Sequence, residues 1–161
     1  MPTTTRQIDF SFRKMLDEVL EGDHHNYCYQ CGACVAVCPV TRFRSDFNPR
    51  LIVLNALCGQ EDVLLGPDSV IWLCSNCYSC YERCPQDVRP VEVIIALKNL
   101  AAAKGTAPSD LSKFADVVVE TGYSARITHS VNERRKRLGL PELKKAPMDE
   151  IRKILSEESE T

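Results

Sequence analysis

The chain has 161 residues, 44% of them hydrophobic and 26% charged, as is usual for a globular protein. Its formal net charge of -2 gives no overall basic field, which argues against nucleic acid as a partner. Cysteine is the unusual residue: there are nine, while no stretch approaches the roughly 18 uninterrupted apolar residues of a membrane-spanning helix.

The N-terminal segment, MPTTTRQIDFSFRK, lacks the basic-then-apolar pattern of a secretory signal. We therefore expect a cytoplasmic protein, in which clustered cysteines stay reduced and hold metal instead of forming disulfides. The first predicted helix covers about 11–21 and ends at Gly22, with one apolar face made of Phe12, Met15, Leu16, Val19 and Leu20. His24 and His25 follow it, and we expect both in a solvated turn.

Two cysteine runs dominate the middle of the chain. Both have the spacing C-x2-C-x2-C-x3-C-P, which matches the bacterial ferredoxin run, whose first three cysteines hold one [4Fe–4S] cluster while the fourth ligates the other. The proline disfavours the α conformation at the fourth cysteine and so turns it out of its own loop. We expect two [4Fe–4S] clusters, one on Cys28, Cys31, Cys34 and Cys84 and the other on Cys74, Cys77, Cys80 and Cys38.

The cysteines have two alternative uses. A disulfide framework needs an oxidising compartment, and nothing in the sequence signals export. A structural zinc site uses two C-x2-C pairs, so the third thiol of each run would be surplus. The ninth cysteine, Cys58, lies on a predicted apolar helix, where a buried small hydrophobic side chain is the simplest interpretation.

A proline-initiated apolar helix follows each run, so the chain contains an imperfect duplication. After the first run, Asn48 suits the N-cap, Pro49 the first helical position and Gly59 the end. After the second run, Pro90 opens a helix with Glu92 in its first turn, and Gly105 closes it. Between the two units, SVIWL could form a short strand.

The C-terminal third contains further helical patterns. SDLSKFADVVVETG has Ser109 as its expected N-cap and Gly122 as its end, and THSVNERRKRLG and MDEIRKILSEES predict two more helices, with His129 near the start of the first of them. The fold is therefore expected to be mainly α. We expect one domain over 1–161, with a di-cluster core at about 24–105, an N-terminal helix at about 11–21 and a C-terminal helical extension at about 108–158.

The sequence shows no nucleotide-binding loop, flavin fingerprint or Ser-His-Asp grouping. Because eight cysteines saturate two clusters, no iron is left open for a substrate. The chain is expected to relay electrons between partners without being a catalyst itself. The basic stretch Arg134–Arg137 is interpreted as a solvated helix face, with docking to an acidic partner as the alternative.

The chain resembles the C-type subunit of heterodisulfide reductase over nearly its whole length. The resemblance rests on both cysteine runs, the NPR helix after the first run and GYSARITHSVNERRKRLGLPEL near the C-terminus. It implies an α-helical ferredoxin fold and a non-catalytic electron-relay subunit of an oxidoreductase complex. The alternative is an iron–sulfur relay subunit of another anaerobic dehydrogenase or reductase complex, since the cysteine runs alone are widely shared.

The same resemblance implies partners and a pathway. A flavin-containing A-type subunit would supply electrons, and a hydrogenase or formate dehydrogenase would belong to the larger assembly. A B-type subunit would use the electrons to reduce the coenzyme M–coenzyme B heterodisulfide in methanogenesis. The special clusters of that subunit need CCG-type motifs, and this chain has no adjacent cysteines. It is therefore expected to be the relay and not the disulfide-cleaving subunit.

Overall fold

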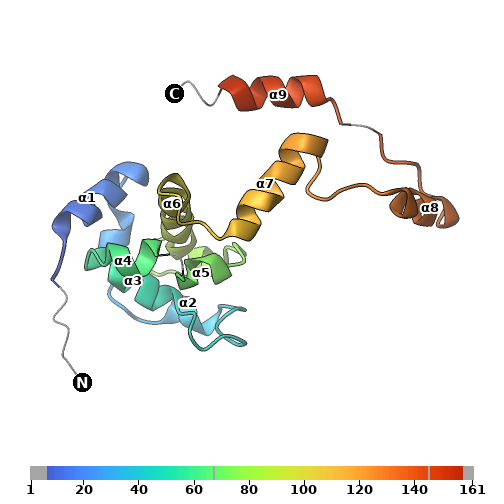
Figure 1. The fold of residues 1–161 in the computed structure, drawn as a ribbon. Coiled ribbons are helices and arrows are strands. Elements are labelled where there is room, and N and C mark those ends of the chain that lie inside the picture. Colours follow the sequence, from blue (N-terminus) through green and yellow to red (C-terminus); the bar gives the residue numbers. More distant parts are fainter. Residues whose placement is uncertain (1–6, 67, 145, 158–161) are drawn as a thin grey trace. The chain divides into compact units, whose positions relative to one another are not determined.

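The computed structural model describes residues 7–66, 68–144 and 146–157, and the regular elements in this part of the chain are all helical (Figure 1). This confirms the predicted mainly-α class. The chain separates into two compact units, 1–107 and 108–161. The single-domain organisation stays a prediction.

The first unit contains six short or medium α-helices and two 3₁₀ helices among its described residues. In chain order they are α1 (Phe10–Val19), η1 (His24–Tyr27), α2 (Ala33–Ala36), α3 (Pro49–Leu57), α4 (Glu61–Leu65), η2 (Val70–Leu73), α5 (Ser79–Glu82) and α6 (Pro90–Ala103). The two helices α3 and α6 each follow a cysteine run, as the duplicated sequence pattern predicts.

Helix α1 begins after Asp9, whose side chain caps the unpaired backbone N–H groups of the first turn. The Asp9 carboxylate accepts from the backbone N–H of Ser11 at 2.8 Å and of Phe12 at 3.4 Å, which are two of the unpaired donors at a helix start. Hydrogen bonds from Ser11 hold the pKa of Asp9 below its usual value. Phe12 and Leu16 are buried, but Val19 is 44% exposed, so the apolar face is narrower than predicted.

Helices α3 and α6 begin and end as their flanking residues predict. The Asn48 side chain accepts from the Leu51 N–H at 3.2 Å, and Pro49 occupies the first turn. Gly59 follows α3 with a φ of 65°, and a Cβ there would collide with the backbone of Asp9, whose N–H bonds to the Cys58 carbonyl at 3.2 Å. A larger residue at 59 would therefore separate α1 from the end of α3.

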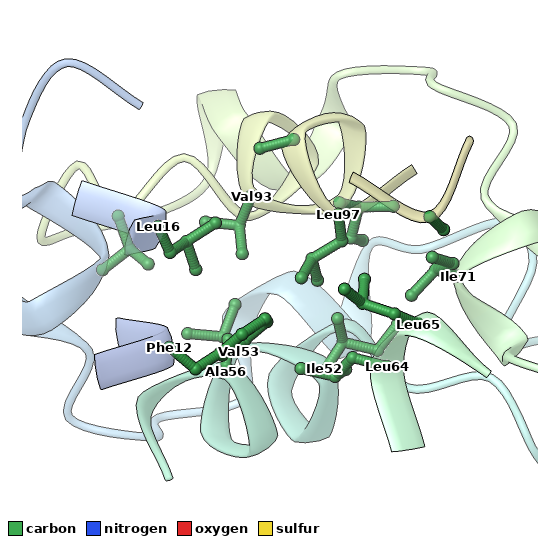
Figure 2. Packing of buried hydrophobic residues seen from close by; sticks show 14 of the residues in the cluster. Phe12, Leu16, Ile52, Val53, Ala56, Leu64, Leu65, Ile71, Val93 and Leu97 are labelled. Atoms are coloured by element: carbon green, nitrogen blue, oxygen red, sulfur yellow. The ribbon is translucent and has the colours of Figure 1, made fainter. Parts of the chain in front are cut away.

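One hydrophobic core joins α1, α3, α4, η2 and α6 (Figure 2). Helix α6 is its centre, because half of the helix is buried and it packs against α1, α3, α4, α5 and η2. The labelled core residues are Phe12, Leu16, Ile52, Val53, Ala56, Leu64, Leu65, Ile71, Val93 and Leu97. The core fixes the helices that follow the two runs and thereby positions both cysteine loops.

The predicted strand in SVIWL is wrong. Val70–Leu73 forms the 3₁₀ helix η2, which Ser69 caps by accepting the Ile71 N–H at 3.4 Å. The run is short and apolar, and periodicity alone does not separate a buried strand from a buried helical turn in such a run. A strand also needs a neighbour to pair with, and the described residues contain no other strand.

The second unit consists of α7 (Ser109–Thr121), α8 (His129–Arg137) and α9 (Met148–Glu157) in the part that the structure describes. Ser109 is the first residue of α7 and not its N-cap, which is Pro108, while Gly122 ends the helix with a φ of 70° as predicted. His129 opens α8, also as predicted. Helix α7 packs against α9.

Candidate metal centre

The two cysteine runs adopt the same backbone path. In each, a left-handed residue precedes the second cysteine, Gln30 (φ 62°) in one and Asn76 (φ 51°) in the other. A second left-handed residue follows that cysteine, Gly32 (φ 83°) or Tyr78 (φ 60°), and opens the short helix α2 or α5. These alternating conformations curl each loop tightly. The sequence duplication is thus also a structural duplication, and α2 packs against α5.

The fourth cysteine of the first run lies with the second run. Cys38 lines a cavity together with Cys74, Cys77 and Cys80, and mostly apolar residues complete its walls: Val40, Phe47, Pro49, Ser75, Tyr78 and Val91. Cys38 and Cys80 are buried, Cys74 is half-buried and Cys77 is exposed. Burial raises the pKa of Cys74, and the charges of Cys38 and Cys77 raise it further. Four cysteines from two distant segments therefore line one cavity.

The other four cysteines of the two runs are Cys28, Cys31, Cys34 and Cys84. Burial is the main cause that raises the pKa of Cys34 to about 11, and the charges of Cys28 and Cys31 add to it. Cys84 follows the second run in sequence, yet its charge acts on Tyr29 beside the first: the pKa of Tyr29 is raised by its hydrogen bond with Cys31 and by the charges of Cys31 and Cys84. Cys84 therefore lies on the side of the first run.

The donor set fits iron–sulfur clusters. Burial and the charges of neighbouring thiols raise the pKa of Cys80 to about 12, so this thiol stays protonated unless positive ions offset its charge, as bound metal does. No three His, Cys, Asp or Glu side chains of the described residues gather closely enough for one metal ion. The cysteines of a cube each bind a different iron, so they stand further apart.

Two basic side chains, each on the helix that follows a cysteine run, form hydrogen bonds to the loop of that run. The sequence did not predict either contact. From α6, the Lys98 ammonium donates to the Cys74 carbonyl at 2.9 Å and to the Asn76 side chain at 3.1 Å. From α3, Arg50 donates to the Gln30 side chain at 3.3 Å, and Gln30 in turn donates to the Cys28 sulfur at 3.2 Å. Each is the single basic residue of a mostly apolar helix, but no motif in the sequence marks its contact with the loop.

Hydrogen bonds also reach the sulfur atoms. The backbone N–H of Val88 donates to the Cys84 sulfur at 3.3 Å. The Cys77 sulfur and the Ser79 hydroxyl form a hydrogen-bonded pair at 3.5 Å, and this pairing lowers the pKa of Cys77. Donors to cluster sulfurs are among the groups that set the reduction potential of an iron–sulfur protein.

The prediction of a solvated turn is wrong for His25. His24 is exposed, but His25 is fully buried at the start of η1, with its Nε2 3.3 Å from the Asp17 carboxylate. Neither ring nitrogen makes a hydrogen bond to the described residues. Burial lowers the pKa of His25, although Asp17 opposes this effect. The polar sequence EGDHHNYC hides the burial, because the 3₁₀ turn points one of two adjacent histidines inward.

Cys58 lies apart from both cysteine groups. It is half-buried at the end of α3, and its carbonyl accepts from the Asp9 N–H and from the Gln60 side chain, each at 3.2 Å. It is thus less buried than predicted. Its position is accounted for by the junction between α3 and α1.

Comparison with known proteins identifies the same class of site. Residues 24–88 match the model of the 4Fe-4S dicluster domain. The chain is 38% identical to the C2 iron–sulfur subunit of the CoB–CoM heterodisulfide reductase of Methanocaldococcus jannaschii, over 81% of this chain and 72% of that protein. It is 35% identical to the C-type subunit of the H2:CoB–CoM heterodisulfide, ferredoxin reductase of Methanothermobacter thermautotrophicus, over 92% and 82%.

A third relative is the C-type subunit of the ferredoxin:CoB–CoM heterodisulfide reductase of Methanosarcina mazei, 32% identical over 70% of this chain and 68% of that protein. Among the described helices, none combines the length and the apolar character that a membrane crossing requires. The similarity extends over both cysteine runs and confirms the resemblance drawn from the motifs. The chain therefore belongs to the family of C-type iron–sulfur subunits of CoB–CoM heterodisulfide reductase.

Proposed function

We propose that this chain relays electrons within a heterodisulfide reductase complex, through two [4Fe–4S] clusters. The observation that carries the proposal is the neighbouring pair of four-cysteine groups, in which Cys38 shares a cavity with the second run. When bound, each cluster accepts and releases one electron at a time. The dicluster match over 24–88 supports the same number of clusters.

The proposed ligands are divided across the runs. Cys28, Cys31, Cys34 and Cys84 hold one cluster, and Cys74, Cys77, Cys80 and Cys38 hold the other. The protein's own residues orient these thiolates through the curled loops, and they exclude water from Cys38 and Cys80, which are buried. The charge of Cys34 in the first group also raises the pKa of Cys80 in the second, which indicates that the two groups are neighbours. Electron transfer between two clusters requires such proximity.

Each proposed group of ligands has one cysteine exposed to solvent. Cys31 of the first group and Cys77 of the second are exposed, whereas the other cysteines of the two groups are half-buried or buried. A redox partner could therefore approach a cluster held by either group at its exposed cysteine. In the proposed pathway a flavin-containing A-type subunit is the donor, supplied by a hydrogenase or formate dehydrogenase, and a B-type subunit is the acceptor. The proposed location is the cytoplasm.

Disulfide cleavage belongs to the B-type partner in this proposal. The sequence contains no adjacent cysteines, so it lacks the motif that the special clusters of that subunit need. All eight run cysteines are taken up as ligands, which leaves no iron open to a substrate. The heterodisulfide of coenzymes M and B is therefore reduced elsewhere in the complex.

The purified, cluster-loaded chain is expected to exchange electrons with viologen dyes but not to reduce the heterodisulfide. The measurement compares anaerobic dye oxidation by the chain alone, with and without heterodisulfide, against the same assay after addition of the B-type subunit. Turnover should require that subunit. Heterodisulfide reduction by the single chain would contradict the relay assignment, and an inability to accept electrons from any dye would contradict the redox function itself.

A further inference from the structure

The loop 39–47 presents a phenylalanine to solvent between two arginines. Phe43 is 87% exposed, the largest exposed fraction among the large hydrophobic side chains that the structure describes. Arg42 and Arg44 on either side are exposed as well. An exposed aromatic side chain is unfavourable in water, and a partner that covers it removes apolar surface from water, which stabilises the complex.

Internal hydrogen bonds hold this loop in one conformation. The Val40 carbonyl accepts the backbone N–H groups of Phe43 at 3.0 Å and of Arg44 at 2.9 Å. The Arg44 guanidinium binds the Asp46 carboxylate through two bonds of 2.7 and 3.0 Å. A loop that is ordered before binding loses little conformational entropy on binding. Phe43 is therefore exposed by the ordered conformation of the loop.

The base of the loop belongs to the second cysteine group. Cys38 precedes the loop, and Val40 and Phe47 line the cavity that Cys38 shares with the second run. Phe47 is buried, with 1% of its surface exposed, and its carbonyl accepts the Thr41 hydroxyl at 3.2 Å. A partner that covers Phe43 would thus lie beside this group, where an electron would have a short distance to travel.

The charges around Phe43 identify the chemistry of the partner. Arg44 is neutralised by Asp46, whereas Arg42 makes no ion pair with the described residues. Arginine beside an aromatic anchor is typical of the side chains that dominate protein interfaces. We propose that loop 39–47 is a docking element for a redox subunit of the complex whose surface offers an apolar pocket bordered by carboxylates. This inference rests on the proposed relay function.

The test measures binding of the cluster-loaded chain to the purified A-type and B-type subunits separately, under anaerobic conditions. Phe43→Ala is expected to weaken binding of one of the two at least tenfold. The matched control is Phe10→Ala, which removes an aromatic ring that is 67% exposed on α1 and should change binding less than twofold. Arg42→Gln should flatten the salt dependence of the association rate. Iron content should be unchanged in all three variants.

The docking role would be overturned by unchanged binding of Phe43→Ala to both subunits, by an equal loss in Phe10→Ala, or by loss of iron from Phe43→Ala. If sedimentation shows that the wild type self-associates and Phe43→Ala does not, the loop contacts a second copy and the proposal is wrong. Failure of the relay function has a different signature, because the wild-type chain would then bind neither subunit.

Discussion

Replacing Cys84 with serine is expected to damage the cluster of the first run and to leave that of the second nearly intact. Cys84 stands four residues after Cys80 in sequence, but its charge reaches Tyr29 beside the first run. Its counterpart Cys38 lines the cavity of the second run. A hydroxyl is a poorer ligand for iron–sulfur clusters than a thiolate, so the affected site should lose most of its iron.

The measurement is iron content together with the electron paramagnetic resonance spectrum of the reduced protein. Cys84→Ser and Cys28→Ser should give the same spectrum, with about four irons left per chain, whereas Cys38→Ser should match Cys74→Ser. Cys58→Ser is the matched control, since this cysteine lies outside both groups, and it should retain all the iron. If Cys84→Ser instead resembled Cys74→Ser, each run would hold its own cluster and the crossed ligation would be wrong.

Leu97→Ala is expected to destabilise the first unit by about 2–5 kcal/mol. Leu97 is completely buried on α6, in the core that Figure 2 shows together with Ile71 and Leu65. Removing its side chain loses buried apolar surface and leaves a cavity that close-packed neighbours fill only partly. For a unit of about 100 residues, a loss of this size lowers the thermal midpoint by on the order of 10 °C or more.

Replacing an exposed leucine with alanine is the control, because it removes the same side chain without leaving a cavity in the core. Leu51 lies on α3 in the same unit and is 42% exposed, so Leu51→Ala should change stability by less than about 1 kcal/mol. Anaerobic thermal scans of both loaded variants make the comparison. Equal midpoints for Leu97→Ala and Leu51→Ala would mean that the helical core is not what holds the cysteine loops in place.

Local chemistry predicts most of the first unit. The helices after both runs begin and end as their prolines, Asn48, Gly59 and Gly105 indicate, because capping and left-handed turns depend on a few neighbouring residues. Cysteine spacing similarly predicts that each fourth cysteine leaves its own loop, since the proline after it acts locally. The placement of Cys38 in the second cavity agrees with this expectation, while the ligand sets themselves stay predictions.

Features that depend on distant contacts were not predictable in this way. SVIWL has the composition of a strand but no strand to pair with among the described residues, and it becomes a capped 3₁₀ turn. His25 is buried on η1, which packs against α3, and its Nε2 lies 3.3 Å from the Asp17 carboxylate of α1. The polar sequence around His25 does not reveal these contacts. Lys98 and Arg50 reach back to loops that lie 24 and 20 residues before them in the chain, and no motif marks such contacts.

The central claim is that this chain carries two [4Fe–4S] clusters, and its iron and acid-labile sulfide content tests that claim most directly. Protein prepared without oxygen is expected to contain about eight iron and about eight sulfide per chain, to be brown and to become paramagnetic on reduction. Stoichiometric zinc with no acid-labile sulfide would contradict the claim, because the cysteines would then form a structural site that carries no electrons.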